Sequence, residues 1–158
     1  MSGSARPGPS LEDARERVVL SITRRPDELL VFEHGPEFPD AGLQVPGGGL
    51  DPGETPLQAA VREALEETGL RLTGPTYLCA RPWARGGRSE RWHFVHLWAA
   101  ADTPDAWSQR VSAGEQDAGM IFHQRFAPLH DPGLTPGHGD DAALSTLLQH
   151  LSTPRIQP

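Results

Sequence analysis

The sequence predicts an α/β fold in which a mixed β-sheet is sandwiched between helices (α/β/α). Three observations lead to this expectation. The chain has 158 residues, which is the size of one domain with a substantial core. Short apolar, β-branched runs are separated by turns, as in strands of a sheet. Two segments have helical periodicity, which gives the order three strands, helix, three strands, helix.

Two apolar runs near the N-terminus predict a pair of strands. They comprise Arg17–Thr23 and Leu29–Glu33, and the segment between them contains Pro26 and Asp27, which are typical turn residues. A loop follows and ends in the short apolar piece Leu43–Val45, which we expect to be the third strand.

The clearest helical pattern spans Pro56–Thr68. Thr55 is a suitable N-cap, Pro56 suits the first helical position, and Gly69 suits the C-terminal stop. The side expected to pack on the sheet carries Leu57, Val61, Ala64, Leu65 and Thr68.

The C-terminal half predicts three further strands and a helix. Thr76–Trp83 and Trp92–Ala100 flank an Arg- and Gly-rich hairpin, and Met120–Pro128 forms the last strand. Asp141–Leu151 carries a stripe of leucines, which indicates an amphipathic helix. We expect residues 1–14 to be a flexible leader, 15–151 to be one domain and 152–158 to be a flexible tail.

The composition excludes several classes of protein. The net charge is −7, which argues against general binding to nucleic acid. All 14 basic residues are Arg, so a Schiff-base lysine and a Walker-type phosphate loop are excluded. Cys79 is the single cysteine, so the chain has no internal disulfide and no Cys-based zinc site. No apolar run reaches the roughly 18 residues that a membrane span needs, and no signal-peptide core is evident, so we expect a cytoplasmic protein without membrane contact.

Three carboxylates lie on the other side of the central helix, at positions i, i+3 and i+4: Glu63, Glu66 and Glu67. Like charges at this spacing repel one another, and a hard divalent cation such as Mg²⁺ or Mn²⁺ would relieve the repulsion. Glu54 adds a carboxylate before the helix. The alternative is an acidic, solvated helix face without a ligand.

The whole segment resembles the Nudix box, which is Gly, five residues, Glu, seven residues, then Arg-Glu-aliphatic-x-Glu-Glu-x-Gly-aliphatic. In this chain it spans residues 48–70 as GGLDPGETPLQAAVREALEETGL. The fixed identities are Gly48, Glu54, Arg62, Glu63, Glu66, Glu67 and Gly69. Ala64 stands where a bulkier aliphatic residue is usual, a mild change. The resemblance implies the Nudix fold, with residues 15–151 as a Nudix hydrolase domain.

The resemblance also implies an activity and roles for individual residues. Nudix hydrolases cleave a phosphoanhydride bond in a nucleoside diphosphate linked to another moiety. Members use Mg²⁺ or Mn²⁺, and the implied metal ligands are Glu63, Glu66, Glu67 and the carbonyl of Gly47. Glu63 is implied to hold or deprotonate the attacking water, and Arg62 to orient a carboxylate. Gly48 and Glu54 are implied to support the loop.

The resemblance does not fix the roles of residues outside the box. Members differ in an auxiliary base, for which the candidates are Glu115, Asp117 and His123. Arg81 and Arg91, near the hairpin, are candidates for phosphate binding, and Trp83 is a candidate for stacking on a base. The alternatives are that the arginines are solvated hairpin residues and that the tryptophan packs in the core.

Three functions remain open from the sequence. The first is a hydrolase of small nucleotides: nucleoside triphosphates, nucleotide sugars or dinucleoside polyphosphates. The second is a non-catalytic Nudix-fold nucleotide sensor or regulatory module, which the intact box disfavours. The third is an enzyme that processes RNA ends, which the net charge of −7 disfavours. Many members are homodimers, and the sequence leaves a homodimer open.

Overall fold

A computed structural model describes residues 14–113 and 118–153, with only the backbone of Arg85. The strands are β1 (Arg15–Arg24), β2 (Glu28–His34), β3 (Gly47–Gly49), β4 (Thr76–Arg85), β5 (Arg88–Trp98), β6 (Ala106–Arg110) and β7 (Ile121–Pro128). The helices are α1 (Pro56–Thr68) and α2 (Leu144–Ser152). The expected leader, and the tail beyond residue 153, lie outside the described residues. None of the described helices has the length and apolar character that crossing a membrane requires.

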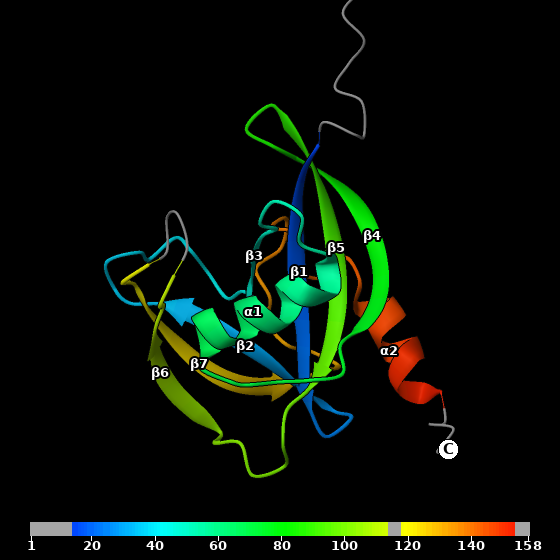
Figure 1. The fold of residues 1–158 in the computed structure, drawn as a ribbon. Coiled ribbons are helices and arrows are strands. Elements are labelled where there is room, and N and C mark those ends of the chain that lie inside the picture. The colour runs from blue at the N-terminus through cyan, green and yellow to red at the C-terminus, as the bar shows by residue number, and fades with distance from the viewer. Residues whose placement is uncertain (1–13, 114–117, 154–158) are drawn as a thin grey trace, which may run out of the picture.

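Within the described residues the strands form one seven-stranded sheet: six follow the order β4-β5-β1-β2-β7-β6, and the seventh, β3, pairs with β1 outside this order. The sheet is mixed, because β1 runs parallel to β5 and the other pairs are antiparallel. The second half of β1 pairs with β2 and its first half pairs with β3. Strand β1 therefore connects the two parts of the sheet and brings the glycine segment to its N-terminal end (Figure 1).

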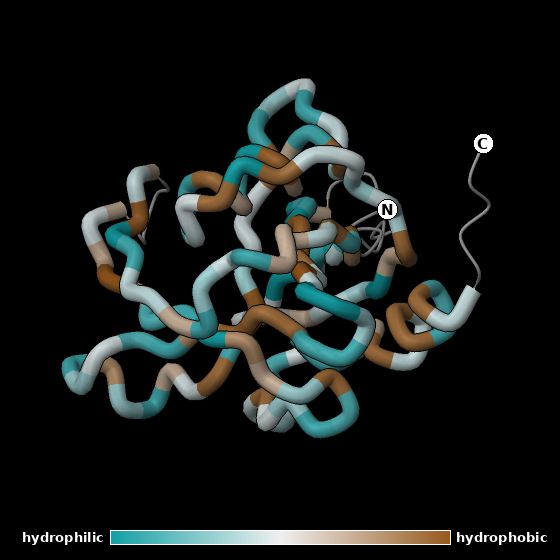
Figure 2. The backbone as a smooth tube through the Cα atoms, turned by 90° about the horizontal axis from the view of Figure 1, so that it is seen from below, coloured by the Kyte–Doolittle hydropathy of each residue, from teal (hydrophilic) through white to brown (hydrophobic). Residues whose placement is uncertain are grey.

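Helices cover both faces of the sheet, as the sequence predicts. On one face, alanines of α1 pack on β1 and β5 residues such as Leu20 and Val95. On the other face, Leu147 of α2 packs against Val19 and Phe94. Hydrophobic segments gather along the central strands, while the outer loops are largely hydrophilic (Figure 2). The α/β/α prediction is confirmed.

The bounds and caps of α1 are confirmed, but its expected packing face is only partly right, because Ala64 and Thr68 are buried whereas the larger aliphatic residues are not. Thr55 accepts a hydrogen bond from the Gln58 backbone N–H, and Gly69 ends the helix with φ 79°. The buried residues are Ala59, Ala60, Glu63, Ala64, Glu67 and Thr68. Leu57 and Leu65 remain more than a third exposed. Alanines let the helix approach the sheet closely, and this approach also buries two of the acidic side chains.

Other boundaries differ from expectation for physical reasons. The third strand is the glycine run 47–49 and not Leu43–Val45. A Cβ on Gly47 would lie 2.5 Å from the backbone oxygen of Val18, so only glycine allows this pairing. Strand β6 was not expected, because its five residues are polar and alternate between exposed and half-buried at the sheet edge. Helix α2 begins at Leu144, later than the expected Asp141.

The hairpin between β4 and β5 follows the expectation closely. Gly86 and Gly87 form its two-residue turn and both have positive φ, 57° and 78°. Two positive φ values match a turn whose twist suits antiparallel strands, and glycine adopts them without strain. The hairpin extends beyond the rest of the sheet at the N-terminal end of β1 (Figure 1).

Candidate active site

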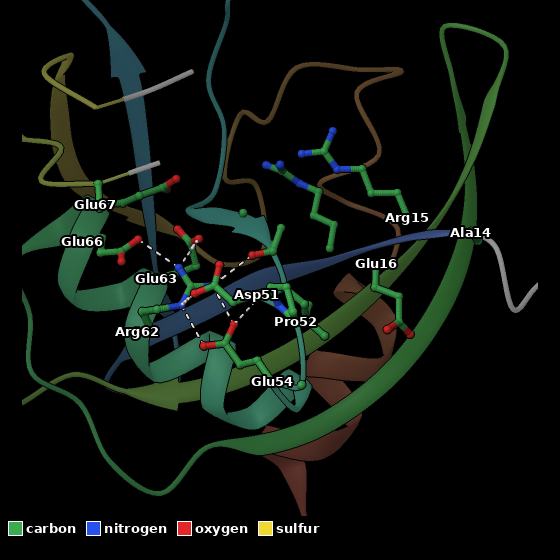
Figure 3. Close-up of a pocket in the computed structure, with 16 residues that line it drawn as sticks. Ala14, Arg15, Glu16, Asp51, Pro52, Glu54, Arg62, Glu63, Glu66 and Glu67 are labelled. Carbon is green, nitrogen blue, oxygen red and sulfur yellow. Dashed lines mark hydrogen bonds and ion pairs between the residues drawn. The ribbon is translucent and has the colours of Figure 1, made fainter. Parts of the chain in front are cut away.

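A cavity of about 990 Å³ opens between the glycine loop, α1 and the start of β1. Its acidic lining comprises Glu16, Asp51, Glu54, Glu63, Glu66 and Glu67, and its basic lining comprises Arg15, Arg17 and Arg62. Figure 3 shows the box glutamates on α1 at one side and Arg15 reaching into the space from β1. The glutamates of the box thus form one polar wall of a cavity large enough for a nucleotide.

Arg62 connects the loop to the helix. Its Nε and Nη2 donate to the two oxygens of Glu54, both at 2.8 Å. Its Nη1 donates to Glu63 at 2.8 Å and to Glu66 at 3.0 Å, and Nη2 also reaches the Gly49 carbonyl at 2.9 Å. The hydrogen bond from Arg62 lowers the pKa of Glu54. One guanidinium therefore partly neutralises three carboxylates and fixes the loop on the helix.

Glu63 is almost completely buried at this wall, with 6% of its surface exposed. Desolvation by burial raises the pKa of Glu63 to about 7, although the Arg62 hydrogen bond opposes the shift. A Cβ on Gly48 would collide with the Glu63 carboxyl group. Gly48 therefore supplies the space in which this carboxyl group sits, a role consistent with its expected place in the loop.

Glu67 is held by the strand next to it. The backbone N–H of Gly47 donates to Glu67 Oε2 at 3.0 Å, and the Glu67 side chain is buried. The Glu67 carbonyl accepts a hydrogen bond from Gln124 of β7 at 3.0 Å. Gly47 was expected to act through its carbonyl, and the structure records its N–H as a contact of Glu67. The pairing of β3 with β1 thus orients an acidic side chain of α1.

The chemistry of this wall fits a hard divalent cation. Carboxylate oxygens are the donors that Mg²⁺ and Mn²⁺ prefer. In residues 14–113 and 118–153, however, no three His, Cys, Asp or Glu side chains are grouped closely enough to hold an ion. Arg62 explains the positions of the Glu63 and Glu66 carboxyl groups, because its Nη1 donates a hydrogen bond to each of them. A cation would compete with these two contacts.

The remaining expected site residues are dispersed. Arg81 and Arg91 line neither this cavity nor the smaller one beside it; Arg91 is 3.9 Å from Glu16. His123 is exposed and bonds to Ser108 at 2.8 Å. Trp83 lines the smaller cavity. Glu115 and Asp117 lie outside the described residues.

Two arginines of β1 belong to the site although the sequence pattern did not single them out. Arg15 and Arg17 both line the large cavity, and Arg17 also lines the smaller one. The available signal is their alternation ahead of an otherwise apolar strand, since alternating residues point to the same face. Asp51, 3.2 Å from Arg62, was also not singled out.

Comparison with known proteins identifies the family. A model described as the NUDIX domain matches residues 14–147. An RNA pyrophosphohydrolase of Azorhizobium caulinodans is 43% identical over 67 residues, 39% of this chain and 40% of that protein. Diphosphoinositol polyphosphate phosphohydrolase 3-alpha of Mus musculus is 28% identical over 137 residues, 78% of this chain and 80% of that protein. The chain spans only 40% and 24% of the first two curated relatives, the second being the NAD-capped RNA hydrolase NudC of Vibrio cholerae.

Solved structures agree with this assignment. A NUDIX hydrolase from Nitrosomonas europaea has a TM-score of 0.65 at 19% identity, covering 89% of this chain and 93% of that one. A C. elegans Ap4A hydrolase has a TM-score of 0.65 at 18% identity, covering 88% and 98%. Identities this low show a shared fold alone. The family match extends over most of the chain and includes every position of the box, so the chain belongs to the Nudix family.

Proposed function

We propose that this chain is a Mg²⁺- or Mn²⁺-dependent pyrophosphohydrolase. Its substrate would be a nucleoside diphosphate linked to a further group, as in a nucleoside triphosphate, a nucleotide sugar or a dinucleoside polyphosphate. The observation that carries this proposal is the cavity in which the box glutamates of α1 face the arginines of β1. Hydrolase names among the relatives support the reaction type.

The two sets of charges suit a substrate that is itself a polyanion. Arginine binds phosphate oxygens bidentately, so Arg15 and Arg17 would hold the phosphate that lies away from the helix. Glu66 and Glu67, with Glu63, would hold the cation. When bound there, a divalent cation supplies neutralisation of phosphate charge and lowers the pKa of water.

Residues of the chain would position the attacking water and the phosphoanhydride bond. Water attacks one phosphorus, the bond from that phosphorus to the bridging oxygen breaks, and the bridging oxygen keeps the electron pair. Glu63 would accept the proton of the attacking water. Arg62, bonded to Glu54 and Glu63, would keep the loop and the carboxyl group aligned.

A non-catalytic nucleotide sensor is the alternative, and product analysis separates the two functions. The protein is incubated in ¹⁸O-labelled water with Mg²⁺ or Mn²⁺ and a panel of nucleoside triphosphates, nucleotide sugars, dinucleoside polyphosphates, diphosphoinositol compounds and 5′-triphosphorylated RNA. The expected result is cleavage of a phosphoanhydride bond, with ¹⁸O in one product showing which phosphorus is attacked. Tight binding of a nucleotide without cleavage under either metal would contradict the proposal and favour the sensor.

A further inference from the structure

The last turn of α1 is held by hydrogen bonds from outside the helix. The final carbonyls of a helix have no partner within it, so a helix end without outside donors tends to open. In this chain the carbonyls of residues 66–68 each accept a hydrogen bond from β6, β7 or the segment after β6. In order, the donors are the Ser112 backbone N–H at 3.1 Å, the Gln124 amide at 3.0 Å and the Trp107 indole at 2.9 Å. Two of these carbonyls belong to Glu66 and Glu67, the glutamates that are proposed metal ligands.

Gln124 is a polar residue at a position where β7 is otherwise apolar. Phe122, Gln124 and Phe126 alternate along the strand and therefore face the same side of the sheet. Gln124 is only 2% exposed, although glutamine is mostly a surface residue. In the described part of the chain its Oε1 is buried and accepts no hydrogen bond. Burial of a half-satisfied amide opposes folding, so core stability does not account for a glutamine here.

Glu67 is held at both its side chain and its backbone. The Gly47 N–H of β3 donates to its carboxylate, and the Gln124 amide of β7 donates to its carbonyl, both at 3.0 Å. Strand β3 pairs with β1 whereas β7 pairs with β2, so the two donors come from different parts of the sheet. One bond fixes a carboxylate oxygen and the other fixes the peptide group from which the side chain extends. Together they restrict the carboxylate more than either bond does alone.

We propose that Gln124 is a positioning residue for the divalent cation, which acts through the Glu67 backbone and not by contact with the cation or the substrate. This inference rests on the proposed function, in which Glu67 is a metal ligand. Gln124 lines neither of the two cavities described above. Without its hydrogen bond the last turn of α1 would be free to open, and Glu67 would no longer be fixed in place for the cation.

Gln124→Met tests the inference, because methionine is unbranched and of similar length but cannot donate to the Glu67 carbonyl. Binding of Mn²⁺ alone, followed by electron paramagnetic resonance, should be about tenfold weaker than in wild type, as when a group that supports a metal ligand is lost. The melting temperature should stay close to wild type, because removal of a buried oxygen without a partner offsets the lost hydrogen bond. A purely structural role predicts the opposite: a lower melting temperature and unchanged Mn²⁺ affinity. Gln124→Leu repeats the test with a second apolar side chain.

Trp107→Phe is the matched control. Trp107 lies opposite Gln124 in the pairing of β6 with β7, and its indole donates to the carbonyl of Thr68, the residue after Glu67. Phenylalanine keeps an aromatic ring and removes this donor. Because Thr68 is not a proposed metal ligand, the Mn²⁺ affinity should remain close to wild type. An equal loss of affinity in Trp107→Phe and Gln124→Met would show a general effect of the helix end and would overturn the assignment of Gln124.

A double-mutant cycle with Glu67→Gln shows whether Gln124 acts through Glu67. Two residues that act on the same interaction have non-additive effects. We expect Gln124→Met to weaken Mn²⁺ binding by about tenfold in the wild-type background and by clearly less in the Glu67→Gln background. Additive losses would mean that Gln124 influences the cation by another route, which contradicts the inference.

Other results would also overturn the inference: no Mn²⁺ binding to wild type, unchanged Mn²⁺ affinity in the apolar variants, or failure of both apolar variants to fold. These results are distinct from failure of the proposed function, because Mn²⁺ binding is measured without a substrate. Mn²⁺ binding that depends on Gln124, without hydrolysis of any nucleotide, contradicts the hydrolase and leaves the positioning role. Hydrolysis together with unchanged Mn²⁺ affinity in Gln124→Met contradicts the positioning role and leaves the hydrolase.

Discussion

Arg62 and Glu54 form a bidentate ion pair in which both carboxylate oxygens accept hydrogen bonds at 2.8 Å. The two side chains are only 24% and 13% exposed, so solvent screens the pair less than it would at the surface. The same guanidinium also holds Glu63 and Glu66. The loop before α1 and the acidic wall of the cavity therefore depend on one side chain.

Replacement of Arg62 by Lys tests this dependence. Lysine keeps the positive charge but cannot donate two parallel hydrogen bonds to Glu54 while also reaching the glutamates of α1. We expect a loss of about 1–3 kcal/mol in the free energy of unfolding, measured by urea titration, because charge-assisted hydrogen bonds are broken. We also expect at least a tenfold fall in kcat. Arg88→Lys, at the exposed hairpin, should leave both quantities unchanged.

If Glu66 and Glu67 hold the cation as proposed, Glu66→Gln and Glu67→Gln should lose activity but keep the stability of the fold. Glutamine at position 67 still accepts the hydrogen bond from Gly47, so the melting temperature should change little. Activity should fall by about 10- to 100-fold or more. Loss of a residue that only supports a metal ligand already has an effect of this size, and loss of a ligand should have at least the same effect. Titration of Mn²⁺ followed by electron paramagnetic resonance should show weaker binding in both variants. Chelation by EDTA should abolish wild-type activity, and Mg²⁺ or Mn²⁺ should restore it.

The control for these variants is Glu33→Gln, an exposed position on β2. Near-wild-type turnover and Mn²⁺ affinity in both box variants would place the cation, and the reaction, somewhere else. Activity that survives complete removal of metal would be evidence for a different mechanism.

Gly47 and Gly48 are adjacent, yet their replacement by Ala should have different consequences. At Gly47 the new Cβ would meet the Val18 backbone oxygen at 2.5 Å, and backbone cannot yield without breaking the pairing of β3 with β1. We expect Gly47→Ala to lower the free energy of unfolding by about 1–3 kcal/mol. At Gly48 the new Cβ meets the end of a side chain, the Glu63 carboxyl group.

Gly48→Ala should therefore leave stability close to wild type and reduce kcat, because Glu63 can rotate away from its position. Thermal unfolding and initial-rate kinetics on the same preparations give both readouts. Equal losses of stability in the two variants would show that the glycine run acts only as a structural element.

The ion pair of Arg24 and Glu28 predicts a pH-dependent contribution to stability. Arg24 Nε donates to Glu28 Oε2 at 2.7 Å, and this hydrogen bond holds the pKa of Glu28 below its ordinary value. The folded state therefore favours the ionised carboxylate. The contribution is complete above the unfolded pKa of about 4.3 and is lost as the pH falls through the lower folded pKa.

We expect wild type to be more stable than Glu28→Gln at pH 7 and the difference to shrink progressively below about pH 4.3. Urea unfolding at intervals between about pH 3 and pH 7 measures the difference at each value. Asp105→Asn is the comparison variant, since Asp105 also contacts Arg24, at 2.7 Å, but is almost fully exposed. A difference that stays constant or grows toward acid pH would contradict the assigned role of the pair.

The sequence alone determined the local structure of the box. Thr55, Pro56 and Gly69 set the ends of α1, because capping depends on neighbouring residues and on a backbone conformation that favours glycine. The seven fixed identities of the box gave the resemblance to the family, and the spacing of its glutamates is local too, because a helix converts sequence spacing into a common face. The two-glycine turn of the β4–β5 hairpin is equally local.

Only the tertiary structure decided which face of α1 is buried. Leu57, Val61 and Leu65, at four-residue steps, suggested one face. The sheet instead accepts the narrow alanine face, and Glu63 and Glu67 turn inward, where Gly47 and Gly48 leave room. Likewise, Arg17 and Asp140 are 123 positions apart and meet one pocket only because β1 and the loop before α2 converge there. Helical periodicity and residue type act over a few residues, whereas close approach between distant segments depends on the packing of the whole chain.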